Sequence, residues 1–356
     1  MDTSHIDTAV IGAGAAGLIA GRLLQDRGTD FAIFDEHARV GDAWRERYRS
    51  LRLFTPRRWG SLPGAQPDIG FFAFPTGAQM TDYLEGYAER FDLPVHASSP
   101  VTRLRHDDAG RFTLTVGDGE EVTADHVIVA AGAHRRAVVP PFAADLDPDV
   151  TQVTSIDYRG PEDLAPGPVL VVGAGNSGTD IALEAAAAGH ATAIAGRHPG
   201  QIPFDIDTPI GNLMSGLVLR MLRATTLGSA RGRAMIEAHR DHGLNLIRNK
   251  VKDLDAAGVR RVGRVERVEN RMPVLADGER LTPATVVWCT GSVPILDWIE
   301  IPGVHTGGQV HHWIAPTDAG SSSGCRENHR CVALHLVCRP ASVGTKQHET
   351  KNGEEP

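Results

Sequence analysis

The hydrophobic pattern shows the same succession of elements twice along the chain. Residues 10–36 read VIGAGAAGLIAGRLLQDRGTDFAIFDE, and residues 171–197 read VVGAGNSGTDIALEAAAAGHATAIAGR. Each stretch begins with a short apolar run typical of a buried strand, passes through a glycine-rich turn into an Ala/Leu-rich helical pattern, and ends in a second apolar run. Gly28 and Gly189 follow the helical patterns, where a glycine commonly ends a helix. We therefore expect two β-α-β units in an α/β protein.

Both turns spell Gly-x-Gly-x-x-Gly, and the second loop lies 161 residues after the first. The first glycine permits a tight turn, the second lets a pyrophosphate approach the backbone, and the third lets the helix pack closely on the strand. The free N–H groups and the dipole of the helix start then stabilise phosphate charge. We expect two dinucleotide sites, with contacts from Gly12, Ala13, Gly14, Ala15, Ala16 and Gly17 in the first and from Gly173, Gly175, Asn176, Ser177 and Gly178 in the second.

The two units differ where the ribose of a dinucleotide should lie. The first unit ends in FDE, and Asp35 falls 23 residues after Gly12, where a carboxylate accepts hydrogen bonds from ribose hydroxyls. Glu36 is the neighbouring alternative. In the second unit the acid is replaced by Gly196 and Arg197 follows, and an arginine pairs with a 2′-phosphate that a carboxylate would repel. The first loop therefore favours FAD, and the second favours NADPH over NADH.

Charge and composition narrow the range of partners. The formal net charge is -8 and no basic run stands out, which argues against nucleic acid and against a membrane surface as partners. The longest other apolar run, Ile210–Leu222, is interrupted by polar residues and predicts a packed or lid-like helix. The start of the chain lacks the basic region of a signal peptide, so we expect a cytoplasmic protein. Its four cysteines form no CxxC pair and fit a reducing compartment; they are Cys289, Cys325, Cys331 and Cys338.

Several segments outside the loops resemble the flavin-containing monooxygenase-like family, especially its short bacterial CzcO-like members and the plant YUCCA type. HARVGDAWRERY after Asp35 resembles the flavin segment of this family, with Asp42 in place of a glycine. LRLFTPRRWGSLPG, residues 51–64, resembles the loop that lines the flavin, and residues 74–95 resemble the helix that follows it. VIVAAGAH at 127–134 and VVWCTG at 286–291 resemble the two strand-to-glycine crossings between the dinucleotide domains.

The resemblance implies two Rossmann-like, three-layer ββα dinucleotide-binding domains, with the NADPH domain inserted into a discontinuous FAD domain. We expect the FAD domain at residues 1–158 and 281–340, the NADPH domain at 159–280, and a disordered tail at 341–356. The further FAD contacts that it implies are Trp44, Val101, Ala131, Gly132, Thr290 and Gly291.

The resemblance also implies the reaction. NADPH would give hydride to FAD, and the reduced flavin would take up O2 as a C4a-hydroperoxide that transfers one oxygen atom to a small substrate with a nucleophilic N or S atom or a carbonyl. The chain would then be an NAD(P)H-dependent flavoprotein monooxygenase. No catalytic side chain is assigned, because the cofactors carry the chemistry while the protein positions and shields them. The histidines at 305, 311 and 312 lack a spaced partner, so we expect no metal site.

Two departures from the family keep other functions open. Thr154 stands where the monooxygenases usually have a histidine, and the resemblance ends near residue 312, where a tail containing only one strand-like run, CVALHLVC, begins. An NADPH–flavin reductase or oxidase without oxygenation therefore stays open, as does an inactive protein with a degenerate C-terminus. A disulfide reductase of the thioredoxin-reductase type is disfavoured, because it needs a cysteine pair near the flavin and residues 1–288 contain no cysteine.

Overall fold

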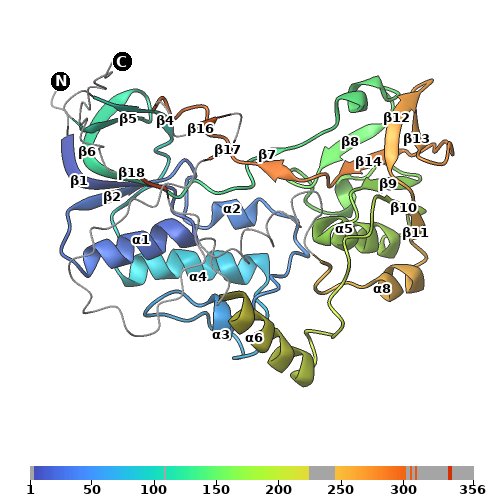
Figure 1. The fold of residues 1–356 in the computed structure, drawn as a ribbon, viewed down its shortest axis with the longest axis horizontal. Coiled ribbons are helices and arrows are strands. Elements are labelled where there is room, and N and C mark those ends of the chain that lie inside the picture. Colours follow the sequence, from blue (N-terminus) through green and yellow to red (C-terminus); the bar gives the residue numbers. More distant parts are fainter. Residues whose placement is uncertain are drawn as a thin grey trace, which may run out of the picture. The chain divides into compact units, whose positions relative to one another are not determined.

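The computed structural model describes residues 4–107, 110–223, 245–301, 305–306, 309–310 and 336–338. The chain forms two compact units, each assembled from separate stretches of sequence (Figure 1). The first takes in residues 1–36, 93–130 and 296–356, and the second takes in residues 37–92 and 131–295. The chain therefore enters and leaves each unit more than once.

The first unit is built on a mixed sheet around strand β1. β1 runs parallel to β2 on one side and to β6 on the other, and β6 continues into antiparallel pairs with β5 and then β4. Helix α1 (Ala15–Gln25) connects β1 to β2. The terminal strand β18 pairs with the last residues of β6, beyond the point where β5 ends. The strands of this sheet are β1 (Ser4–Ile11), β2 (Phe31–Phe34), β3 (Val95–His96), β4 (Val101–His106), β5 (Phe112–Val116), β6 (Glu120–Val129) and β18 (Leu336–Cys338). β16 (His305–Thr306) and β17 (Gln309–Val310) form a separate two-stranded sheet.

The second unit is built on a five-stranded sheet in the order β11-β10-β9-β14-β8, and all its pairs are parallel. Helix α5 (Asn176–Ala187) connects β9 to β10, so the second glycine loop repeats the connection of the first. The strands are β8 (Thr151–Thr154), β9 (Val169–Val172), β10 (Thr192–Ala195), β11 (Arg260–Val262) and β14 (Thr285–Trp288), with the hairpin of β12 (Val265–Glu269) and β13 (Met272–Leu275) and the short pair of β7 (Arg136–Ala137) and β15 (Ser292–Val293).

The remaining helices also belong to the second unit. Helix α4 begins in a capping box, in which Thr76 Oγ1 accepts from the Gln79 N–H at 3.1 Å and the Gln79 side chain accepts from the Thr76 N–H at 3.0 Å. In the described part of the chain, no helix is long and apolar enough to cross a bilayer. The helices are α2 (Asp42–Arg45), α3 (Arg57–Gly60), α4 (Gly77–Arg90), α6 (Pro209–Arg223) and α8 (Val251–Ala256), with the 3-10 turns Pro141–Asp145 and Pro161–Asp163.

The cores follow from the uninterrupted apolar runs. All four residues of β9 are buried, as are all four of β14, because a parallel strand covered on both faces has no side that meets water. One core cluster joins β1 and β2 to the antiparallel strands through Leu104, Phe112 and Leu114. The other two clusters lie on the sheet of the second unit.

The predicted fold class is confirmed: the protein is α/β, with one Rossmann-like β-α-β core in each unit. The second sheet also takes in β8 and β14, which lie outside the residues assigned to the NADPH domain, because β14 pairs directly with β9. The predicted domain boundaries were drawn around cofactors and stay a prediction. The strand-like run near the C-terminus does contain β18, whereas the predicted disordered tail lies outside the described residues.

Both glycine loops depend on a close backbone contact. A Cβ atom at Gly17 would lie 1.8 Å from the carbonyl oxygen of Gly12, and a Cβ atom at Gly178 would lie 1.8 Å from that of Gly173. Backbone atoms cannot give way as a flexible side chain can, so the third glycine of each loop is needed for the helix to meet its strand. Gly12 and Gly173 have φ of 104° and 115°, which favours glycine for a second reason.

We predict that Gly178→Ala lowers the free energy of unfolding by about 1–3 kcal/mol, because the added methyl overpacks the contact between α5 and β9. Gly86→Ala is the matched control, since a Cβ there meets nothing within 4 Å in the middle of α4. That change should stabilise the protein by about 0.5–1 kcal/mol. Urea unfolding followed by circular dichroism would measure both, and equal effects would contradict the contact.

Candidate dinucleotide sites

The first loop leaves the start of α1 open to a ligand. Gly14 is the N-cap of α1, no side chain caps it, and the first turn carries no acidic residue. A Cβ atom at Gly14 would meet nothing within 4 Å, in contrast to Gly17. The N–H groups of the first turn and the positive end of the helix dipole therefore face space in which a phosphate fits.

The second loop has the same construction at the start of α5. Gly175 is the N-cap without a capping side chain, the first turn contains no acid, and a Cβ atom at Gly175 would also meet nothing within 4 Å. The N–H of Gly173 donates to the Ala195 carbonyl at 2.8 Å, as the Gly12 N–H donates to the Phe34 carbonyl at 2.7 Å. The two loops are therefore equivalent in backbone geometry.

The two loops differ in the residue that follows the second strand of each β-α-β unit. Asp35 Oδ2 accepts a 2.6 Å hydrogen bond from the Ala13 N–H, which holds this carboxylate beside the first loop. At the corresponding place of the second unit, Gly196 adopts a φ of 144°, and a Cβ atom there would lie 3.1 Å from the Ala174 nitrogen. No carboxylate can reach the second loop from this position, and the charge that follows is that of Arg197.

Arg264 is a second cation at the same edge of the sheet, and it was not predicted from the sequence. β10 and β11 run parallel with Ala195 opposite Val262, so both strands reach their carboxyl ends together. Two residues further on, the strands are followed by Arg197 and by Arg264, which is exposed and has no ion pair with any described residue. The only sequence signal is the short RRVGR run at residues 260–264, and it points to this site only once the pairing of β10 with β11 is known.

The adenosine side of the first site is assembled from neighbouring strands. The Ser99 N–H donates to the Asp35 carbonyl at 2.7 Å, and this places the start of β4, and with it Val101, next to the strand end that carries Asp35 and Glu36. The Ala130 N–H donates to the Ile11 carbonyl at 2.7 Å, which brings the end of β6 against the first loop.

The segments that directly follow the two predicted crossings pair with each other in the second unit. β7 pairs with β15, and the Val138 N–H donates to the Gly291 carbonyl at 2.9 Å. Thr290 Oγ1 also donates to the Val138 carbonyl. Gly132 and Gly291 have φ of 81° and 97°, as expected for residues that turn the chain out of a strand. Thr290 and Gly291 therefore lie beside Val138, six residues after Gly132, whereas Trp44 lies on the separate short helix α2.

The side chain of Asn176, a predicted contact of the second loop, is hydrogen-bonded within the protein. Its amide donates to the Asn245 carbonyl at 3.2 Å and accepts from the Ile247 N–H at 3.0 Å. The first turn of α5 is thus tied to the segment that begins at residue 245, and only the backbone of Asn176 is left for a phosphate. Ser177 hydrogen-bonds the hydroxyl of Tyr48.

A buried carboxylate fixes the next turn of the same helix. Asp180 accepts from the Tyr48 hydroxyl at 2.8 Å and from Arg248 Nη2 at 3.0 Å, and Asn249 Nδ2 donates to it as well. Burial and the neighbouring negative charge raise the pKa of Tyr48, so its hydroxyl stays protonated and keeps donating. Two segments far apart in the sequence, at Tyr48 and at residues 248–249, are therefore held against α5, directly after its glycine loop.

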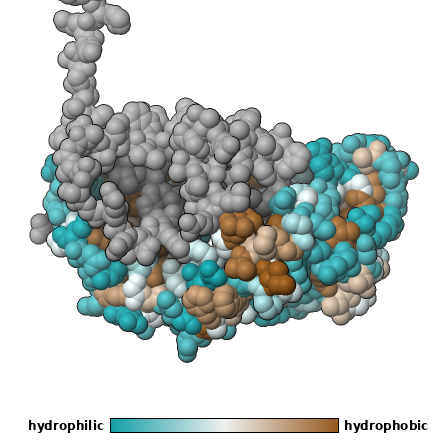
Figure 2. Space-filling model, turned by 60° about the horizontal axis from the view of Figure 1, so that its bottom comes forward, coloured by the Kyte–Doolittle hydropathy of each residue, from teal (hydrophilic) through white to brown (hydrophobic). Residues whose placement is uncertain are grey.

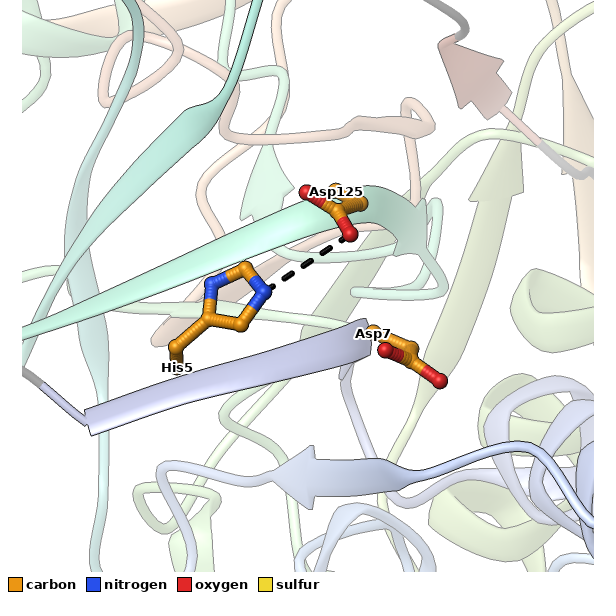
Figure 3. Close-up of side chains that lie close together, drawn as sticks. All are labelled: His5, Asp7 and Asp125. Atoms are coloured by element: carbon orange, nitrogen blue, oxygen red, sulfur yellow. Dashed lines mark ion pairs between the residues drawn. The ribbon is translucent and has the colours of Figure 1, made fainter.

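A further polar cluster lies at the opposite end of β1 from the first loop (Figure 3). His5 Nε2 lies 3.6 Å from Asp125 Oδ2, His5 Nδ1 lies 3.1 Å from Thr123 Oγ1, and Asp7 completes the group. All three titratable side chains are exposed. We interpret the cluster as a surface ion pair, which contributes little to stability.

Cys289 lies against the second loop without the chemistry of a redox thiol. A Cβ atom at Gly173 would lie 2.2 Å from the Cys289 carbonyl oxygen, so the strand end and the loop are in contact. Burial raises the pKa of the Cys289 thiol to about 12, which keeps the thiol protonated and unreactive at neutral pH. A cavity of about 330 Å³ between α4 and residues 65–69 is lined by none of the predicted cofactor residues.

Two open glycine loops in two β-α-β cores define the class of two-dinucleotide oxidoreductases. Residues 9–213 match the pyridine nucleotide-disulphide oxidoreductase family. A CzcO-like oxidoreductase of Geobacillus kaustophilus, itself uncharacterised, is 32% identical over 86% of this chain and 86% of its own length. The probable indole-3-pyruvate monooxygenase YUCCA9 of Arabidopsis thaliana is 31% identical over 50% of this chain and 44% of its own.

A solved structure extends this similarity to the fold. The flavin-containing monooxygenase of Stenotrophomonas maltophilia matches with a TM-score of 0.66 and 27% identity, covering 87% of this chain and 85% of the other. The chain belongs to the pyridine nucleotide-disulphide oxidoreductase family and, within it, to the flavin-containing monooxygenase-like group. It is a flavin-dependent oxidoreductase.

We predict that native Cys289 is alkylated at pH 8 at least about a hundredfold more slowly than the same cysteine after unfolding, because its thiolate is scarce when the pKa is raised to about 12. Iodoacetamide labelling followed by mass spectrometry of the peptide that contains Cys289 would measure both rates. Equal rates would show that the thiol is accessible and ionisable.

Proposed function

We propose that the protein is an NADPH-dependent flavoprotein monooxygenase that inserts one oxygen atom from O2 into a small substrate with a nucleophilic N or S atom or a carbonyl. One observation carries the proposal: two loops of equal backbone geometry are followed by opposite side chains. Asp35 stands beside the first loop, whereas Gly196 and Arg197 follow the second.

The first loop fits the diphosphate and ribose of FAD. Its backbone is open at Gly14, and α1 offers uncapped N–H groups to a phosphate. The hydrogen bond from the Ala13 N–H holds the Asp35 carboxylate beside this loop, where a carboxylate accepts hydrogen bonds from ribose hydroxyls. We assign Gly12, Ala13, Gly14, Ala15, Ala16, Gly17, Asp35, Glu36, Trp44, Val101, Ala131, Gly132, Thr290 and Gly291 to this cofactor.

The second loop fits NADPH in preference to NADH. Arg197 supplies the positive charge that a 2′-phosphate needs, and Gly196 removes the acid that would repel it. Arg264 follows the neighbouring strand and adds a second cation at the same edge. We assign Gly173, Gly175, Gly178 and the backbone of Asn176 and Ser177 to the pyrophosphate.

The residues assigned here bind and orient two cofactors. When bound, the nicotinamide and the flavin supply hydride transfer and the activation of O2. The network around Asp180 holds the first turns of α5 rigid, so the phosphates meet a preformed site. The chain's contribution is therefore positioning and the exclusion of water, which limits the loss of activated oxygen as peroxide.

One observation favours a second function, an NADPH–flavin oxidase that releases peroxide. Thr154 Oγ1 bonds Asp157 Oδ2 at 2.5 Å and accepts from the backbone N–H of Ile156 and Asp157, each at 3.3 Å. The Thr154 hydroxyl is hydrogen-bonded within a local turn, so it does not take over the role of the histidine that the monooxygenases carry at this position.

We predict that the purified protein is yellow, binds FAD, and oxidises NADPH in air. Product analysis with a panel of amines, sulfides and ketones, together with a peroxide assay, distinguishes the two functions. Oxygenated product in proportion to NADPH consumed supports the monooxygenase, whereas peroxide in proportion to NADPH with every substrate supports the oxidase. Protein that takes up no FAD would contradict both.

We predict that Arg197→Ala raises KM for NADPH about tenfold or more and leaves KM for NADH within about twofold, because only NADPH carries the 2′-phosphate. Arg264→Ala should act in the same direction and less strongly. Arg260→Ala is the matched control in β11, four residues before Arg264, since its guanidinium pairs with Glu279. Steady-state kinetics with both nucleotides measure the effects, and equal losses for NADPH and NADH would refute the role of the arginine concerned.

A further inference from the structure

Helix α4 forms one wall of the cavity of about 330 Å³, and residues 65–69 form the other. The residues that α4 contributes recur at i, i+3, i+4, i+7, i+8 and i+11, from Gln79 to Arg90, so they lie on one face of the helix. A volume of this size is enough for a small organic molecule. None of the residues assigned to FAD or NADPH lines the cavity, so a ligand here would be additional to the two cofactors.

Two tyrosines of α4 give the cavity an apolar part. The Tyr83 hydroxyl accepts from the Leu62 N–H at 2.6 Å and donates to the Ala65 carbonyl at 3.0 Å. The Tyr87 hydroxyl donates to the Pro63 carbonyl at 2.7 Å. These bonds hold residues 62–65 against α4. Since the hydroxyls are bound to the backbone, the two residues offer a ligand the apolar surface of their rings.

Three charged side chains of the lining are not paired within the described part of the chain. Asp68 and Asp82 are exposed, and neither has a hydrogen bond or ion pair with a described residue. Arg90 is exposed as well and pairs with no described carboxylate. Glu85, which belongs to the same helix but does not line the cavity, is paired with two arginines. The lining therefore has two carboxylates and one guanidinium available to a ligand.

Gly86 keeps the space between these charges open. It lies four residues after Asp82 and four residues before Arg90, so the two charged residues are about 12 Å apart along the helix axis. A Cβ atom at Gly86 would meet nothing within 4 Å. The cavity is therefore elongated along α4, with an acid towards one end and a base towards the other.

The surface near the cavity is also mixed in character. Helix α3 directly precedes the segment that forms the second wall. Figure 2, in which the side of the molecule that carries α3 comes forward, shows hydrophilic and hydrophobic side chains next to each other on that side. A ligand with both charged and apolar groups matches such surroundings better than a purely apolar one.

The lining disfavours the simplest charged ligands. A metal ion needs several ligand atoms close together, and Asp68 and Asp82 do not form such a group. Among the described residues, the only group of that kind is His5, Asp7 and Asp125. An inorganic anion would meet two carboxylates and only one arginine. A zwitterion, by contrast, forms charge-assisted hydrogen bonds at both ends of the cavity.

We propose that the cavity binds a small zwitterion, a molecule that carries an ammonium group and a carboxylate on an apolar body. The ammonium group is held by Asp82 and Asp68, and the carboxylate by the guanidinium of Arg90. The apolar body packs against the rings of Tyr83 and Tyr87. This site does not depend on the proposed oxygenation, because its binding is measured without NADPH or substrate.

Calorimetric titration of the full-length protein with para-(aminomethyl)benzoate tests the proposal. Benzylamine and benzoate are the matched ligands, since each lacks one of the two charged groups. We expect the zwitterion to bind about fivefold or more tightly than either of them. Arg90→Gln should lower the affinity for the zwitterion about fivefold or more and leave that for benzylamine within about twofold, whereas Asp82→Asn should lower both.

Two further variants test the place of binding. Gly86→Leu puts a side chain between the two charges and should abolish binding, and it should keep the fold because leucine is a better helix former than glycine. Glu89→Gln is the matched control, since it removes a charge from the same helix outside the cavity and should leave the affinity within about twofold. Circular dichroism checks that each variant is folded.

Four outcomes would overturn the proposal. They are no saturable binding of para-(aminomethyl)benzoate to the wild-type protein, equal binding to the wild type and to Gly86→Leu, equal losses in Asp82→Asn and Glu89→Gln, and displacement of the zwitterion by FAD or NADPH. Asp82 and Arg90 are exposed, so their variants keep the proposal testable if Gly86→Leu does not fold.

Discussion

Two backbone contacts determine the organisation of this protein. In each unit the helix after the glycine loop meets its strand so closely that a methyl group at Gly17 or Gly178 would overlap a carbonyl oxygen. That closeness directs the first turn of the helix past the end of the strand, where its N–H groups are uncapped. The open space at Gly14 and Gly175, the register of the strands and the position of the residues that follow the second strand all depend on it.

The two units share this scaffold, and one residue after the second strand sets the charge beside each loop. The carboxylate of Asp35 is hydrogen-bonded to the first loop, and the second loop has a glycine in the same place. In the proposed function, the first loop therefore binds a dinucleotide with a free ribose and the second binds one with a 2′-phosphate, and the two cofactors form an acceptor and a donor of hydride. The Asp180 network stiffens only the second loop, through side chains from segments far apart in the sequence.

The sequence was sufficient to predict both glycine loops, but not the tertiary contacts around them. The spacing of glycines and apolar runs was sufficient for both β-α-β cores, because these signals are local. The pairing of β10 with β11, which sets Arg264 beside Arg197, depends on tertiary contacts and could not be read from a single strand. Asn176 was predicted as a cofactor contact, yet its side chain binds a segment about 70 residues away. The apolar run of α6 suggested a buried face, and only the structure shows that Asn212 faces inward.

We propose that the two loops bind different dinucleotides independently. Calorimetric titration of the flavin-free protein with FAD and with adenosine 2′,5′-bisphosphate tests it most directly, in the wild type and in Gly14→Ala and Gly175→Ala. A Cβ at either glycine meets only empty space, so both variants should fold. We expect one site for each ligand, with FAD binding lost only in Gly14→Ala and bisphosphate binding lost only in Gly175→Ala. Competition of the two ligands for one site, or the loss of both in either variant, would contradict the account.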